Sequence, residues 1–318
     1  MNIANNALTF AEQCVRQIYF RSPAIRNLRG RPTEPLPRTL DMAGFRSRLR
    51  NAGVSTGASV MVHAALGRIR IRNSPEEDEI INPIAVAENI IGALRTLIGS
   101  EGTILMPAFP KYPNESDYFD FEKTAEQIPC FDPLRTKSKS GVLSEVFRKQ
   151  PGTLRSEFPL QTVCAQGSLA SEFISRNIED GGGLAHGPNS PYGRLVGQRG
   201  NVISIGVPLV DYATIIHAPE DARFETWPCK DFWRIRWFDV VRSNGVERVR
   251  VLERHPKYSR GYAEERVRRD LQAAGILDED TVGAVEVHAF RADRLFEYFM
   301  QKNLTSTYPF FWPRISAL

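Results

Sequence analysis

The sequence predicts an α/β fold, a three-layer α/β/α sandwich whose central sheet is mostly parallel or mixed. Two observations predict it. Short β-branched apolar runs alternate with longer amphipathic stretches, which is the pattern of strand–helix–strand units. The chain has 318 residues, of which 42 % are hydrophobic, and this provides enough material for a large core. We therefore expect one large domain preceded by an N-terminal arm.

The N-terminal residues 1–38 differ in composition from the rest. After one short helix, the stretch FRSPAIRNLRGRPTEPLPRTL is basic and rich in proline, which is typical of an arm or linker. The regular pattern starts near Asp41. Residues 39–318 are therefore predicted to form the folded domain.

The first elements of that domain alternate between helix and strand. A helix is predicted over 42–54 from its apolar spacing, and a buried strand over 59–66 from its β-branched run. A strongly amphipathic helix follows over 83–99 and ends at Gly99, and the next buried strand covers 102–109. Helix and strand recur here in the order that an α/β sandwich requires.

The second half continues the alternation after an irregular segment. Residues 110–135 are rich in proline, asparagine and aromatic residues without periodicity, so they are predicted to form a long loop, a common place for function. Helices are predicted over 139–150 and 262–277, and a buried strand over 201–207. Residues 284–303 are predicted to be a strand that leads into a final helix.

Charge and cysteine content exclude several classes of protein. The net charge is +4, and the arginine clusters are those of solvated faces, with no nucleic-acid-binding motif beside them. The four cysteines form no C-x-x-C pair, so neither a disulfide framework nor a zinc site is expected. No apolar run reaches the roughly 20 residues of a membrane span, and no secretory signal is evident. We expect a cytoplasmic protein without nucleic-acid, membrane or metal partners.

One histidine follows a predicted buried strand in a distinctive setting. Thr214, His217 and Glu220 recur at three-residue spacing, which on a helix places them on one face. A carboxylate at that spacing orients an imidazole as a general base requires. A core histidine with a structural role remains open. Pro219 requires either a short turn at His217 or a new helix with proline in its first turn.

Two other histidines and one cysteine are expected to have structural roles. His186 precedes a glycine–proline loop and His288 lies in a strand-like run. Cys164 lies in an apolar stretch, so we expect a buried core thiol rather than an acyl-cysteine.

Five segments together resemble the aminoglycoside 3-N-acetyltransferase family. They are VMVHAALGRI, EGTILMPAFP, FDPLRTKSKSGVLSEVFRKQPGTLRSEFP, HGPNSPYGRLV and TIIHAPE. Each is weak alone, but their order and spacing agree with the family from about residue 41 to residue 300. The resemblance implies an acyl-coenzyme A-dependent N-acyltransferase that uses acetyl-CoA or another acyl-CoA as donor. It also implies His217 as general base with Glu220 as its partner.

The resemblance further implies where coenzyme A binds. The contacts come from the turn after the first buried strand and from the start of the Ser-x-x-Gly helix. The backbone N–H groups at such a helix start suit a phosphate or a thioester carbonyl, although an ordinary capped helix with solvated lysines would have the same sequence. The expected residues are His63, Ala64, Ala65, Lys137, Ser138 and Gly141.

The acceptor is less well defined, because the chain departs from the family pattern. Ala64 and Ala65 replace two serines, and Phe158 replaces a histidine that could shape the acceptor pocket. The net charge favours an acceptor with phosphate, such as a nucleotide-linked amino sugar, whereas Asp117 and Asp120 in the aromatic loop would suit a polycationic aminoglycoside. A diverged, non-catalytic coenzyme A-binding protein is the rival prediction, and a homodimer is left open.

Overall fold

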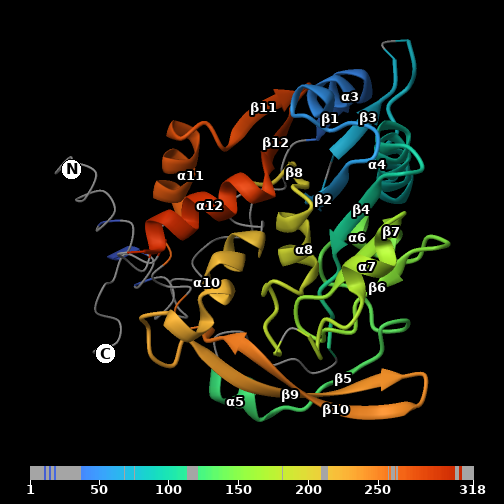
Figure 1. Ribbon diagram of the computed structural model, residues 1–318. Helices are drawn as coiled ribbons and strands as arrows, with labels where there is room; N and C mark the ends of the chain where they lie inside the picture. Colours follow the sequence, from blue (N-terminus) through green and yellow to red (C-terminus); the bar gives the residue numbers. More distant parts are fainter. Residues whose placement is uncertain are drawn as a thin grey trace.

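A seven-stranded sheet forms the centre of the molecule in the computed structural model (Figure 1). The model describes residues 37–309, except 68, 75, 113–120, 181, 209–213, 257, 259–261, 263 and 305–307, together with residues 11, 14, 15 and 18. Across the sheet the strands are β11 (Asp278–Val282), β12 (Val285–Arg291), β8 (Asn201–Ile205), β2 (Ser59–Ala64), β4 (Thr103–Pro107), β7 (Val163–Gly167) and β6 (Leu154–Arg155).

The sheet is mixed. β2 pairs in parallel with β8 and with β4, and these three strands form its centre. The neighbours β12 and β7 run antiparallel to β8 and β4, as do β11 and β6 to their own partners. The α/β prediction is confirmed, and of the two sheet types expected, the mixed one is observed.

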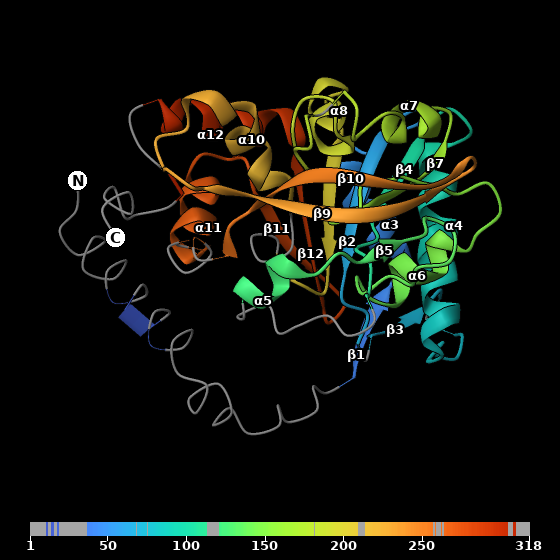
Figure 2. The same ribbon diagram turned by 90° about the horizontal axis from the view of Figure 1, so that it is seen from below.

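Helices cover both faces of the sheet. On one face lie α3 (Met42–Asn51), α4 (Pro83–Ile98) and α6 (Val142–Arg148). On the other lie α7 (Ala170–Ile174), α8 (Pro191–Gly197), α10 (Ala218–Ala222), α11 (Glu264–Ala273) and α12 (Ala292–Asn303) (Figure 2). Alternation along the strands feeds both cores, because successive side chains point to opposite faces. Val60 and Val62 pack with the α4 face and Met61 with the α12 face, which confirms three layers.

The predicted helix over 83–99 is α4, and its ends follow from local sequence. The Asn82 side chain accepts hydrogen bonds from the N–H groups of Ile84 and Ala85, at 2.9 and 3.3 Å, and Pro83 occupies the first turn. The helix ends at Gly99, whose φ of +66° favours glycine. The predicted strands at 59–66, 102–109 and 201–207 are likewise observed as β2, β4 and β8.

A long hairpin was not predicted from the sequence. β9 (Trp233–Arg242) pairs antiparallel with β10 (Gly245–Arg254), and β5 (Cys130–Phe131) adds to β9 in parallel. The hairpin lies along the lower edge of Figure 1. Arginines at many positions hide its apolar alternation, although its inner face forms a separate core. That core contains Tyr112, Phe131, Phe158, Ala185, Phe238, Val240, Val249 and Val251.

Several smaller elements complete the fold. β1 (Arg38–Asp41) and β3 (Ile69–Arg72) form a parallel two-stranded sheet. The predicted loop over 110–135 contains α5 (Phe121–Glu126) as well as β5, and the one-turn helices η1 (Thr214–His217) and η2 (Phe224–Thr226) flank α10. Among the described helices, none combines the length and apolarity that a membrane crossing needs. The predicted arm lies outside the described residues except for its positions 11, 14, 15, 18, 37 and 38.

Candidate active site

His217 is the last residue of η1, and α10 begins at the next residue. Pro219 lies in the first turn of α10, so the expectation of a new helix with proline in its first turn is confirmed. The segment that carries His217 leaves the carboxyl end of β8, where ligands bind in open α/β sheets. The His217 side chain is 18 % exposed.

The predicted partner Glu220 contacts the histidine. The distance from His217 Nδ1 to Glu220 Oε1 is 3.2 Å, and the Glu220 side chain is fully buried. The other oxygen, Oε2, lies 2.7 Å from Nε of Arg254 on β10. One buried carboxylate therefore holds both the imidazole and a guanidinium. The third residue of the pattern, Thr214, lies in η1, and its hydroxyl has no hydrogen-bond partner among the described residues.

Burial dominates the electrostatics of this pair. It raises the pKa of Glu220 to about 7, with Arg254 acting in the opposite direction. Burial, Arg254 and His186 hold the pKa of His217 well below its usual value, and Asp221 opposes them. At neutral pH the imidazole is therefore unprotonated. The contact with Glu220 favours the tautomer with hydrogen on Nδ1, which leaves Nε2 able to accept a proton.

Three residues around this pair were not singled out from the sequence. Arg254 belongs to an arginine cluster that was interpreted as a solvated face, and His186 was expected to be structural. For Asp221, the sequence offered one local indication of a role at the site, which is its position directly after Glu220. Asp221 lies in contact with His186, and Arg254 contacts Glu220, so both carboxylates of α10 have a buried partner. Only the folded chain brings Arg254 and His186 to the site.

The two segments expected to bind coenzyme A lie side by side. A Cβ on Gly141 would lie 3.6 Å from the carbonyl oxygen of Ala64, so the start of α6 faces the end of β2. His63 is buried, burial lowers its pKa to about 4, and its Nε2 has no hydrogen-bond partner among the described residues. Ala65 is exposed, but its N–H donates to the Ile205 carbonyl at 3.2 Å. The backbone N–H of Ala65 is therefore not available to a ligand.

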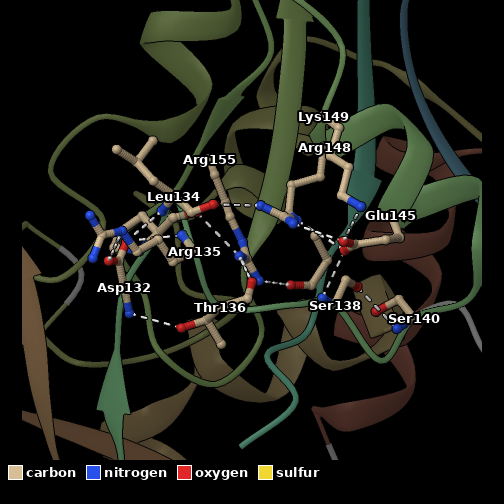
Figure 3. Close-up of polar contacts among 12 residues, drawn as sticks. Asp132, Leu134, Arg135, Thr136, Ser138, Ser140, Glu145, Arg148, Lys149 and Arg155 are labelled. Atoms are coloured by element: carbon tan, nitrogen blue, oxygen red, sulfur yellow. Dashed lines mark hydrogen bonds and ion pairs between the residues drawn. The ribbon is translucent and has the colours of Figure 1, made fainter.

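The segment before α6 is held by its own hydrogen bonds (Figure 3). The N–H of Ser138 donates to Glu145 at 2.9 Å, and the Ser138 hydroxyl accepts from the N–H of Ser140 at 3.0 Å. Lys137 is exposed. Gly141, with φ of +96°, precedes the first turn of α6, which no side chain caps. The N–H groups of that turn and the Lys137 ammonium are the groups suited to an anion or a carbonyl.

Two arginines anchor the same segment (Figure 3). Arg148 donates to the Leu134 carbonyl at 2.7 Å and pairs with Glu145 at 2.8 Å. Arg155 donates to the carbonyls of Thr136 and Ala108, at 2.5 and 2.6 Å. The loop that carries Lys137 and Ser138 is therefore built on charge-assisted hydrogen bonds to its backbone.

Of the three residues expected to contact the acceptor, the structure describes one. Asp117 and Asp120 lie outside the described residues. Phe158 is 3 % exposed and packs in the core beneath the hairpin with Phe238 and Val240. That its ring lines an acceptor pocket stays a prediction, since burial of an apolar ring in that core is favourable in itself.

Two further expectations concern metals and thiols. Cys164 is fully buried and burial raises the pKa of its thiol to about 12, so the expected core role is confirmed and an acyl-cysteine is disfavoured. Within the described part of the chain, no group of three or more His, Cys, Asp or Glu side chains is placed to hold a metal ion.

Comparison with known proteins identifies the family. The model of the aminoglycoside 3-N-acetyltransferase family matches residues 61–303. Aminoglycoside N(3)-acetyltransferase VIII of Streptomyces fradiae is 30 % identical over 268 residues, which are 77 % of this chain and 85 % of that protein. Aminoglycoside N(3)-acetyltransferase VII of Streptomyces paromomycinus is 28 % identical with the same coverage.

A solved structure has the same fold. The binary complex of AAC-IIIb with CoASH superposes with a TM-score of 0.63 at 24 % identity, over 83 % of this chain and 96 % of that one. The family match at 61–303 includes the end of β2, the start of α6 and the His217–Glu220 pair. The chain therefore belongs to the aminoglycoside 3-N-acetyltransferase family.

Proposed function

We propose that this protein transfers an acyl group from acetyl-CoA, or another acyl-CoA, to a primary amine of an amino sugar. The observation that carries the proposal is the partly exposed, unprotonated imidazole of His217 held by the buried Glu220–Arg254 pair. Membership of a family whose relatives are aminoglycoside N(3)-acetyltransferases supports the reaction class.

His217 would act on the proton of the acceptor. An amino sugar arrives as an ammonium ion, which has no lone pair for attack until it loses a proton. Nε2 of His217 takes that proton, directly or through water, while Nδ1 keeps its contact with Glu220. The imidazolium that forms is stabilised by the carboxylate charge of Glu220 and Asp221, which balances the nearby Arg254.

Coenzyme A would bind where the end of β2 meets the start of α6. Gly141 lies against the Ala64 carbonyl, and Nε2 of His63, which has no hydrogen-bond partner among the described residues, is a buried polar atom beside it. Lys137 and the uncapped first turn of α6 favour phosphate or carbonyl oxygen. The bound acyl-CoA supplies a thioester, and the residues of this chain supply position and proton transfer. Ser138 contributes through its hydroxyl, because its N–H is bonded to Glu145.

The finer assignments rest on the same reasoning. Residues 39–318 would form the acyltransferase domain, with residues 1–38 as an arm. The partner would be a small-molecule amino sugar rather than nucleic acid or membrane, and the protein would act in the cytoplasm as a homodimer. The support is the family, whose relatives are named for acetylation of aminoglycosides.

The net charge of +4 favours a second acceptor class, a nucleotide-linked amino sugar with phosphate groups. Values of kcat/KM for an aminoglycoside and for such a nucleotide sugar, measured with one acyl donor, distinguish the two because specificity ratios report differential transition-state binding. A preference for the polycation would assign the pocket to acidic side chains such as the loop carboxylates.

The central test is His217→Ala in a thiol-release assay with an amino-sugar panel. We expect turnover to fall by roughly 10² to 10⁴, the usual contribution of general base catalysis, with coenzyme A affinity by calorimetry little changed. His288→Ala, at a histidine that pairs with Glu279 on β11, serves as the control and should keep its turnover. Near-normal turnover of the His217 variant would contradict the assignment. Coenzyme A binding without thiol release for any amine would favour a diverged binding protein.

A further inference from the structure

A second histidine lies against His217. The ring centroids of His186 and His217 are 5.6 Å apart, and the ring planes meet at 65°, so one ring presents its edge to the other. His186 comes from the segment before α8, far from His217 in the sequence. Its side chain is 1 % exposed, and the ring of Tyr192 packs on it with centroids 4.5 Å apart. The His186 ring is therefore held from both directions and cannot turn to solvent.

Asp221 fixes His186 in that place. Its Oδ2 accepts the backbone N–H of His186 at 2.8 Å and lies 3.6 Å from Nδ1 of the same residue. Its Oδ1 accepts Nε1–H of Trp233, on β9, at 2.9 Å. Both oxygens of this buried carboxylate thus have partners from two separate segments, which leaves it little freedom to move.

The two carboxylates are neighbours on one helical turn. Glu220 and Asp221 are consecutive residues of α10, and each contacts a different histidine. Glu220 holds the Nδ1 edge of His217, while Asp221 holds His186, whose ring then packs against His217. The orientation of both imidazoles is set by the same short helix.

We propose that His186, fixed by Asp221, is a positioning residue that holds the His217 imidazole in the plane required for proton transfer. This inference rests on the proposed function, because it assigns a role toward the same base. His186 is not placed to accept the substrate proton, since its side chain is buried, whereas His217 is partly exposed. A fixed imidazole plane matters because misplacement of a reacting group by about 1 Å can cost about 10²-fold in rate.

His186 and Asp221 shift the pKa of His217 in opposite directions. Burial lowers the pKa of His186, and although burial alone would raise the pKa of Asp221, its contacts with His186 and the Arg254 charge lower it. Asp221 raises the pKa of His217, and His186 lowers it. Among the described residues, the other charged or titratable groups that face His217 are Glu220 on α10, Arg254 on β10 and Tyr262, whose ring centroid lies 6.0 Å from that of His217.

The test uses His186→Phe, which keeps an aromatic ring, and Asp221→Asn, which keeps the shape. Turnover should fall by about tenfold to 10²-fold in each with little change in KM, because the base is misoriented while binding is intact. NMR titration of ring-labelled histidine should show the pKa of His217 rising in His186→Phe and falling in Asp221→Asn. Shifts in the same direction, or unchanged titration with wild-type kcat, would overturn the proposal.

Matched controls separate this role from a loss of fold. His288→Phe disrupts another buried histidine–carboxylate pair, with Nδ1 3.2 Å from Glu279, and should leave the titration of His217 and kcat unchanged. If Asp221→Asn does not fold, Trp233→Phe removes one of its two anchors and should lower kcat without raising KM. In a His217→Ala background, His186→Phe should cause no further loss, and an additive loss would contradict a role through His217. The NMR titration needs no turnover, so it remains readable even if no amine is acylated.

Discussion

Replacement of Arg155 by methionine should release the loop before α6. The Arg155 side chain is 8 % exposed and donates to three backbone carbonyls, those of Pro133 at 3.2 Å, Thr136 at 2.5 Å and Ala108 at 2.6 Å (Figure 3). Its guanidinium also lies 5.0 Å from the ring centroid of Phe131. Methionine retains the apolar contact but supplies no donor, so the three carbonyls lose their shared partner.

The expected loss of stability follows from those contacts. A hydrogen bond to a charged group contributes about 1.5–3 kcal/mol, and three such bonds from one side chain are not additive. The carbonyl of Ala108 is buried and stays unpaired, whereas those of Pro133 and Thr136 are partly buried and can reach water. We therefore expect the free energy of unfolding to fall by about 3–5 kcal/mol.

Urea unfolding followed by tryptophan fluorescence measures this change, and calorimetry measures coenzyme A affinity in the same variant. Because the loop carries Lys137 and Ser138, affinity should weaken by about tenfold, or about 1.4 kcal/mol. Arg135→Met is the matched control in the same loop. The Arg135 side chain is 90 % exposed, and its one ion pair is long, with 3.8 Å between Nε and Oδ2 of Asp132. This substitution should change the free energy of unfolding by less than about 0.5 kcal/mol. A loss below about 1 kcal/mol for Arg155→Met would refute the reasoning.

Two further predictions concern Gly141, in the expected coenzyme A segment, and Glu220, beside His217. Gly141→Asp should abolish coenzyme A binding in calorimetry, because φ of +96° strains any side chain there and the carboxylate would face an anion site near Ala64; unchanged affinity would move the coenzyme elsewhere. Burial raises the pKa of folded Glu220 from 4.5 to about 7, so the stability contributed by its neutral form is complete below about pH 4.5 and is lost as pH rises through about 7. The Glu220→Gln variant does not lose this stability with rising pH, because glutamine cannot ionise. Its free energy of unfolding relative to wild type should therefore rise by about 3 kcal/mol between pH 4.5 and pH 8 in urea titrations, and a pH-independent difference would contradict the raised pKa.

Local patterns in the sequence were sufficient to predict several helices and strands and the His217–Glu220 contact of the site. The strands at 59–66, 102–109 and 201–207 and the helix at 83–99 were predictable, because burial of one face or stripe imposes a period that can be read along the chain. The His217–Glu220 contact was predictable for the same reason, since three-residue spacing on one helical turn makes neighbours. The family was recognisable because its motifs keep their order.

The remaining features depend on which distant segments meet, and no local period records that. The hairpin at 233–254 was missed because its outward arginines obscure the alternation, and its formation decides both that Phe158 is buried and that Arg254 reaches Glu220. Asp221 and His186 are 35 positions apart and come together only when the segment before α8 packs on α10. The sequence by itself determined the fold class, the family and the proposed base. Only the tertiary structure decided the charges around that base, because a buried carboxylate is stabilised by whichever donors the packing of the whole chain brings to it.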